Sequence, residues 1–264
     1  MPLRIAFDLD GVLADMDSEL LRQAQGLFGE HAVRRLERLQ LPAEIETGTA
    51  ETLSDTPRVP IGSPEPPASA PPEAGAADSG PEATFHLTQR QQSRLWRHVR
   101  SIEGFWESLK EIEPGAVAQL DALAKARRWE IIFLTKRPES AGATAQIQTQ
   151  RWLESKGFTL PSVFVVQGSR GRIAASLGLD FVIDDRPENC LDVVVDSKAR
   201  AILVWREDEK LLPVAARRLG IGAVKSVAEC LEILIQIDSP TPQQRPGVVD
   251  RVMRLLGLKE PANA

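Results

Sequence analysis

The sequence predicts an α/β protein in which helices cover both faces of a parallel sheet. Beyond Pro114, short apolar strands alternate with helical segments along the chain. This alternation is typical of parallel sheets, whose crossover connections are helices. The 264 residues, 42% hydrophobic and 26% charged, suffice for one large domain with an insertion or for two modest domains. We therefore expect a Rossmann-like core that needs no disulfide or structural metal.

The predicted elements follow from local patterns. Residues 4–7 form an apolar strand suited to the middle of the sheet. Residues 18–40 and 88–110 are predicted to be amphipathic helices, because large apolar residues recur there at spacings of three and four. The alternating part consists of helix 115–127, strand 130–135, helix 141–156, strand 162–166, helix 171–177, strand 180–184, strand 200–205 and helix 227–237.

A proline-rich stretch at residues 54–83 interrupts this pattern. It holds eight of the 19 prolines, five acids and one base, with almost no large apolar residue. Burial cannot offset the entropy of ordering such a stretch, so we expect a disordered linker. The predicted domains are then a core of residues 1–14 and 113–237, a helical cap of residues 15–112 inserted into it, and a tail of residues 238–264 with a short helix at 248–256.

Composition excludes several classes of protein. The formal charge of −5, from 37 acids and 32 bases, gives no general attraction to nucleic-acid polymers or anionic membranes. Cys190 and Cys230 are too few for a disulfide framework, and no Cys/His cluster has zinc-ligand spacing. The first ten residues contain two aspartates, so they lack the apolar region of a signal peptide, and no apolar run could span a bilayer. We expect a cytoplasmic protein of undetermined oligomeric state.

Two carboxylates follow the first strand in the motif RIAFDLDGVLAD. Residues two apart on an extended chain face the same side, which sets Asp8 and Asp10 together and turns Leu9 away. Gly11 permits a sharp exit from the strand and close approach of the backbone. Parallel strands deliver such residues to the ligand crevice. A solvated turn at the strand end is the alternative for this motif taken alone.

A second acidic pair, Asp184 and Asp185, ends the apolar strand in DFVIDDRPEN. Four carboxylates at one edge of the sheet would repel by about 1 to 4 kcal/mol per close pair. A cation removes this repulsion, and hard oxygen ligands without His or Cys suit Mg²⁺. The alternative, an acidic N-cap for a following helix, loses weight when both acidic clusters are considered together.

Polar and basic residues end another strand, in WEIIFLTKRPES. Thr135, Lys136 and Arg137 offer a hydroxyl and cations of the kind that a phosphoryl group needs. Further along, Arg170 or Arg172 in GSRGRIAASLG could reach the same edge of the sheet. The alternatives are a turn or cap role for Thr135 and solvated loops for the basic residues.

The order of these motifs (DxDG, a strand-terminal Thr, a basic residue, an acidic pair) resembles the haloacid dehalogenase superfamily of phosphohydrolases. Within it, FDLDGVLAD, FWESLKEIEPGA, LTKRP and FVIDDRPEN look most like the pyrimidine 5'-nucleotidase and 5'(3')-deoxyribonucleotidase-like branch. The resemblance covers about residues 1–20 and 100–205. It has no counterpart for the proline-rich linker, and the family's third motif usually has Lys where Arg170 falls.

The resemblance implies a role for each motif residue. Asp8 would be the nucleophile, and Asp10 the general acid and then the general base. The phosphoryl group would be bound by Thr135 and Arg170, which also act in catalysis, with Lys136 and Arg137 beside them as substrate-binding residues. Mg²⁺ would be held by the Asp8 carboxylate, the Asp10 carbonyl and Asp184 or Asp185.

The sequence thus predicts a Mg²⁺-dependent phosphomonoester hydrolase that acts on a small phosphorylated metabolite, with nucleoside monophosphates favoured. Phe105 and Trp106 are candidate stacking surfaces for a base or sugar, although helically spaced aromatics are more often core residues. The alternatives are a phosphotransferase or phosphomutase of the same superfamily, or a non-catalytic module that binds a phospho-ligand or a protein. A receiver domain is excluded, because its acidic pair precedes its phosphorylated aspartate.

Overall fold

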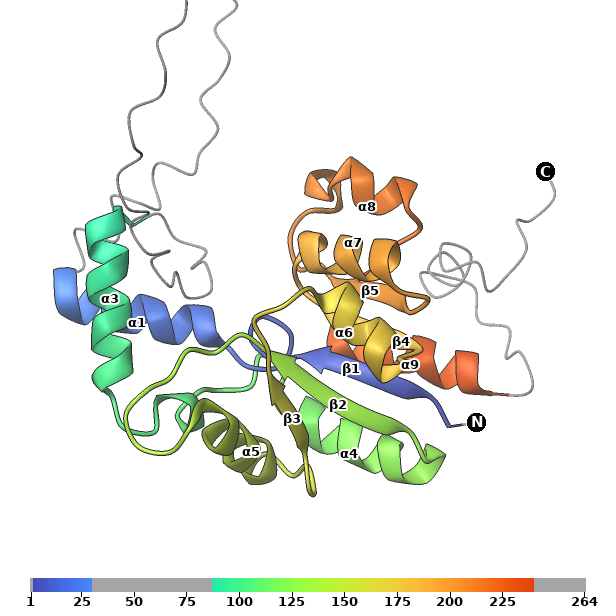
Figure 1. The fold of residues 1–264 in the computed structure, drawn as a ribbon, viewed down its shortest axis with the longest axis horizontal. Helices are drawn as coiled ribbons and strands as arrows, with labels where there is room; N and C mark the ends of the chain where they lie inside the picture. The colour runs from blue at the N-terminus through green and yellow to red at the C-terminus, as the bar shows by residue number, and fades with distance from the viewer. Residues whose placement is uncertain (1, 30–86, 240–264) are drawn as a thin grey trace, which may run out of the picture.

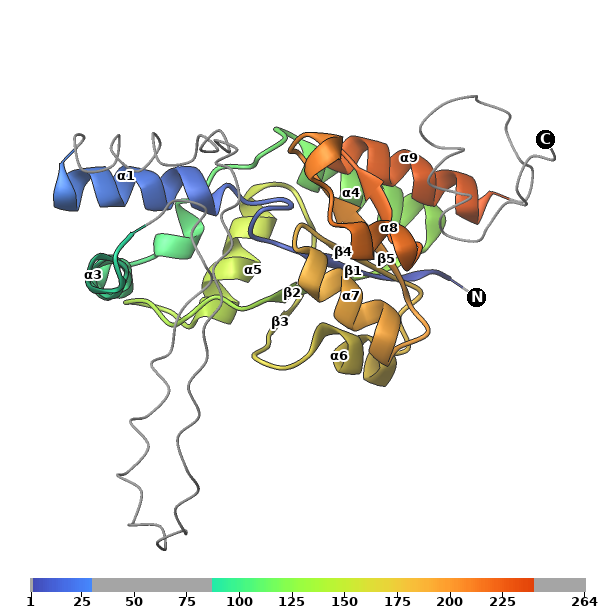
Figure 2. The ribbon, with the colours of Figure 1, turned by 90° about the horizontal axis from the view of Figure 1, so that it is seen from above.

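The computed structural model describes residues 2–29 and 87–239 (Figures 1 and 2). In this part of the chain, parallel strands form one sheet in the order β3-β2-β1-β4-β5-β6. This sheet, with helices on both faces, confirms the predicted α/β, Rossmann-like fold. The first strand is central, as predicted: Phe7 pairs with Phe133 on one side and Ile183 on the other. The strands are β1 (Arg4–Asp8), β2 (Glu130–Thr135), β3 (Ser162–Val165), β4 (Phe181–Asp184), β5 (Arg200–Val204) and β6 (Gly222–Val224).

Each face of the sheet has its own hydrophobic core. Because side chains alternate along a strand, Ile5 and Phe7 enter one core and Ala6 the other. Figure 2 shows the resulting layers, with α4 and α9 above the sheet and α6 and α7 below it. The first core contains α4 (Ala116–Arg127), α5 (Ala145–Ser155) and α9 (Val227–Asp238); the second contains α6 (Arg170–Leu177), α7 (Pro187–Asp196) and α8 (Val214–Arg218).

The described part of the inserted segment is helical. Its elements are α1 (Met16–Phe28), α3 (Gln89–Ser101) and the 3₁₀ turn η2 (Phe105–Glu107). Helices α1 and α3 lie side by side at one end of the molecule (Figure 1), where the Arg94 guanidinium stacks 5.6 Å from the centre of the Phe28 ring. The predicted helix 88–110 is too long: α3 ends at Ser101, because Ile102 is extended and Gly104 is left-handed with φ +64°.

The inserted segment leaves and rejoins the core at neighbouring points. The N–H of Asp15 donates to the carbonyl of Lys110 at 2.9 Å, and that of Ile112 donates to the carbonyl of Leu13 at 2.9 Å. Ala14 and Glu111 form a β-bridge between these two bonds. Both ends of the insertion are therefore fixed beside the carboxyl end of β1.

The remaining predicted strands and helices occur within a few residues of their expected bounds. The sequence interpretation did not assign α7, α8, β6 or the 3₁₀ turn η3 (Glu209–Leu211). The part of the predicted helix 18–40 beyond Gly29, the linker 54–83 and the tail helix 248–256 lie outside the described residues. In the described ranges, no helix has both the length and the hydropathy needed to cross a membrane.

Candidate active site

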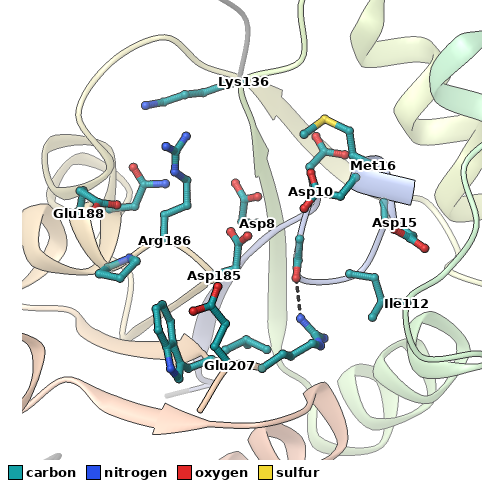
Figure 3. A pocket seen from close by; sticks show the side chains of 18 of the residues that line it. Asp8, Asp10, Asp15, Met16, Ile112, Lys136, Asp185, Arg186, Glu188 and Glu207 are labelled. Atoms are coloured by element: carbon teal, nitrogen blue, oxygen red, sulfur yellow. Dashed lines mark hydrogen bonds between the residues drawn. The ribbon is translucent and has the colours of Figure 1, made fainter. Parts of the chain in front are cut away.

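A pocket of about 540 Å³ opens at the carboxyl end of β1. Its wall is built from the turn after β1, the start of α1, and residues that follow β2, β4 and β5. Figure 3 shows the Asp8 and Asp185 carboxylates in the middle of the pocket, with Lys136 on one side of them and Glu207 on the other. Residues that are far apart in the sequence therefore meet at one edge of the sheet, as expected for adjacent parallel strands.

Asp8 is the last residue of β1 and is only 8% exposed. Its Oδ1 accepts a hydrogen bond from Nη2 of Arg170, the first residue of α6. Burial raises the pKa of Asp8 well above its usual value, and the nearby Asp184 carboxylate raises it further, whereas Arg170 lowers it. The buried arginine therefore favours the charged form of Asp8.

Two of the nitrogen donors of Arg170 make no hydrogen bond within the described residues. It is 2% exposed, and its Nε and Nη1 have no hydrogen-bond partner among the described residues. Nε lies 3.6 Å from Oδ2 of Asp184, too far for a good hydrogen bond. Arg172, the other candidate for this motif, is exposed and lies 3.9 Å from Asp196. Arg170 is thus the arginine that reaches the site.

The two acids that follow β4 have different environments. Asp184 is fully buried: both of its oxygens accept 3.0 Å bonds from the amide of Asn189, and Oδ1 also accepts the N–H of Arg186 at 2.9 Å. Asp185 lines the pocket. Burial, followed by repulsion from Asp184, raises the pKa of Asp185 to about 7. Of this pair, Asp185 is the carboxylate that faces the pocket.

Asp10 is bound by residues from the end of β2. Arg137 donates from Nε to both carboxylate oxygens, at 3.1 and 3.0 Å, and from Nη2 to Oδ1 at 2.7 Å. The hydroxyl of Thr135 donates to Oδ2 of Asp10 at 3.3 Å. Thr135 and Arg137 are buried and do not line the pocket, whereas Lys136 between them does. Of these three predicted substrate-binding residues, only Lys136 faces the pocket.

Phe105 and Trp106 are core residues. Both are fully buried, with ring centres 4.9 Å apart in an edge-to-face arrangement. The expectation that they present a stacking surface was wrong, because both side chains are buried in the hydrophobic core where η2 lies against α5. The alternative considered for them, a role in the core, is correct.

The sequence interpretation missed an arginine that holds the turn after β1. Arg206 donates to the carbonyl of Gly11 at 2.6 Å and to that of Val12 at 3.1 Å. It also pairs with Glu113, whose carboxylate accepts the N–H groups of residues 227 and 228 at the start of α9. The one available signal was local: Arg206 follows the apolar strand β5, as the recognised motifs follow β1, β2 and β4.

The donor set suits a hard divalent cation in type, although the side chains do not form a complete coordination shell. In the described ranges, no group of three or more His, Cys, Asp or Glu side chains is placed to hold a metal ion. Asp8, Asp10 and Asp185 line the pocket, whereas Asp184 does not. The Asp10 carboxylate is bound by Arg137, so Asp8 and Asp185 are the carboxylates better placed to face an ion. Burial is the main cause of their raised pKa values and repulsion between the neighbouring carboxylates adds to it, and an ion with oxygen ligands would relieve this repulsion.

Comparisons with known proteins give no family assignment. No protein-family model and no curated protein matches this sequence. Among solved structures, a hydrolase from Pseudomonas syringae is 17% identical, with a TM-score of 0.46, and the match covers 90% of this chain and 100% of that one. A protein described as a "putative beta-phosphoglucomutase" from Thermotoga maritima is 17% identical, with a TM-score of 0.47, over 88% of this chain and 98% of that one. Likenesses at this level leave the activity of the chain to be argued from its own residues.

Proposed function

We propose that the protein is a Mg²⁺-dependent phosphomonoester hydrolase of the haloacid dehalogenase type. One observation carries the proposal: Asp8 ends the central strand in a pocket, next to a buried arginine with unused donor groups. A carboxylate so placed is a candidate nucleophile, and the spare N–H groups of Arg170 suit the oxygens of a phosphoryl group. The motif order that resembles this superfamily supports the same function.

In the first half-reaction, a carboxylate oxygen of Asp8 attacks phosphorus, and the bond from phosphorus to the leaving oxygen breaks. Asp10 gives its proton to that oxygen, so that the product departs as a neutral alcohol. Asp8 needs no base to activate it once it is ionised. Burial raises the pKa of Asp8, and the Arg170 guanidinium opposes that rise. Arg170 also stabilises charge on the phosphoryl oxygens as the transition state forms.

In the second half-reaction, water attacks the aspartyl-phosphate on Asp8. Asp10 removes a proton from this water, the bond from phosphorus to Asp8 breaks, and inorganic phosphate leaves. Both carboxylates then return to their starting states. Asp8 and Asp185, with the carbonyl of Asp10, are the groups that would hold Mg²⁺. When bound, the ion would supply positive charge for the phosphoryl oxygens and relieve repulsion between the acids.

The size of the pocket favours a small metabolite as substrate. About 540 Å³ lies within the range of small-ligand sites. The resemblance to nucleotidases makes nucleoside monophosphates the first substrates to test. In the alternative reaction, the phosphoryl group passes from Asp8 to an acceptor hydroxyl, and the protein is a phosphotransferase or phosphomutase. Turnover that depends on an added acceptor would indicate that reaction.

The test is phosphate release from a panel of nucleoside and sugar monophosphates, with and without Mg²⁺. We expect Asp8→Asn to abolish release and Asp10→Asn to reduce it by about 10² or more. Asp196→Asn is the matched control, because Asp196 is exposed at the far end of α7. Full activity in Asp8→Asn would disprove its role as nucleophile, and a loss below about threefold in Asp10→Asn would count against acid–base catalysis by that residue.

A further inference from the structure

Arg137 is a fully buried cation whose donor groups point at Asp10 and not into the pocket. Its side chain is 0% exposed, and three of its hydrogen bonds, of 2.7 to 3.1 Å, go to the Asp10 carboxylate. Burying a charged group is costly unless it is paired, and here Asp10 is the partner that balances it. Arg137 therefore has no free face for a substrate phosphate, although it follows β2 within a motif suited to phosphate binding.

The surroundings of Arg137 hold its guanidinium rigidly. Its Nη1 donates to the hydroxyl of Thr149 on α5 at 2.9 Å. The rings of Trp106 and Trp152 lie 5.0 and 5.9 Å from the guanidinium carbon. Both indoles are themselves fixed, because their Nε1 atoms donate to the carbonyls of Pro138 and Leu109, at 3.0 and 2.8 Å. The arginine is thus held by a hydroxyl and two aromatic faces.

We propose that Arg137 is a positioning residue that holds Asp10 as the general base for hydrolysis of the aspartyl-phosphate. This inference rests on the proposed function and concerns its second half-reaction. A general base must keep its acceptor oxygen turned toward the attacking water while the reaction proceeds. Three hydrogen bonds from a fixed donor restrict the carboxylate to one orientation, as a base in a reacting complex requires.

The experiment uses 4-nitrophenyl phosphate, whose leaving group departs without protonation. With this substrate, formation of the aspartyl-phosphate does not need Asp10, whereas its hydrolysis does. In Arg137→Gln we expect kcat to fall about 10-fold or more, while the first turnover slows less than threefold. Rapid-mixing measurements should then show a burst of nitrophenol close to one equivalent of enzyme, followed by slow steady-state release.

Two further variants separate positioning from a role in folding. Thr149→Val removes the acceptor of Nη1 but keeps the arginine, and it should give a smaller fall in kcat with the same burst. It keeps the proposal testable if Arg137→Gln does not fold. Arg151→Gln is the matched control, because Arg151 pairs with Glu107 on η2 at 3.3 Å and is 58% exposed. Its kcat and first turnover should equal those of the wild type.

The outcomes are distinguishable. A burst with slowed steady state in the folded variants supports the proposal. Parallel losses of first turnover and kcat, or no loss of either, would overturn the role of Arg137 and leave the hydrolase function standing. If the wild type releases no nitrophenol and no phosphate from any ester, the proposed function fails, and the inference fails with it.

Discussion

The carboxylate of Asp185 occupies the place where a side chain on Gly11 would lie. A Cβ built on Gly11 would be 1.8 Å from Oδ2 and 2.5 Å from Cγ of Asp185. The φ of Gly11 is also +83°, a conformation that other residues rarely adopt. The acidic end of β4 and the turn after β1 therefore fit together only because residue 11 has no side chain.

Gly11→Ala should displace Asp185 from the pocket. Because Asp185 is one of the two carboxylates that face the proposed ion, we expect a loss of Mg²⁺-dependent phosphatase activity of about 10-fold or more. Gly104→Ala is the control: its φ is +64°, but a Cβ there would meet nothing within 4 Å. Both variants carry backbone strain, but only Gly11→Ala adds a clash, and Gly11 lines the pocket whereas Gly104 does not. Equal activity in the two variants would contradict this prediction.

The raised pKa of Asp185 predicts a pH-dependent stability in metal-free buffer. Its folded pKa of about 7 lies above the unfolded value of about 4, so the folded state binds more protons between these pH values. The free energy of unfolding should therefore fall as the pH rises through this window. Asp185→Asn should reduce the fall and make the protein about 1 to 3 kcal/mol more stable than the wild type at pH 8.

Urea denaturation at pH 4.5 and pH 8, with EDTA present, measures this difference. The wild type at pH 4.5 is the internal reference, because Asp185 is protonated there in the folded state and resembles the uncharged amide. If Asp185→Asn were less stable than the wild type at pH 8, the raised pKa would be wrong.

Arg206 should be important for the stability of the fold. It ties the carbonyls of Gly11 and Val12 to Glu113, which in turn holds the start of α9. Arg206→Ala leaves these acceptors without their charged donor, and we expect a cost of about 1 to 3 kcal/mol in the free energy of unfolding. Thermal or urea denaturation measures the loss. Arg217→Ala is a suitable control, since Arg217 contacts one exposed carbonyl, that of Glu209.

The strands of the site were predictable because their signal is local. In β1, β2 and β4 an apolar run ends abruptly in polar residues, and parallel pairing brings such ends to one edge of the sheet. The pattern therefore indicated which residues meet there. It also indicated the central place of β1, whose residues are buried on both faces.

The partners of these residues were not predictable, because they depend on contacts between distant parts of the chain. Lys136 and Arg137 are adjacent cations, and nothing local shows that Arg137 turns inward. The buried guanidinium of Arg137 lies against the rings of Trp106 and Trp152, which belong to η2 and α5. Helix α8 and strand β6 were missed for a simpler reason: they have five and three residues, too few to show a period.

Two backbone bonds, from the N–H of Asp15 to the carbonyl of Lys110 and from the N–H of Ile112 to the carbonyl of Leu13, fasten both ends of the inserted segment to the core. The pairing of β1 with β2 and β4 holds the sheet together without the inserted segment. Asp8, Thr135 and Asp184 therefore keep their spacing whatever the length of the chain between these two bonds. The inserted segment can therefore change in length or sequence without altering the spacing of these three residues.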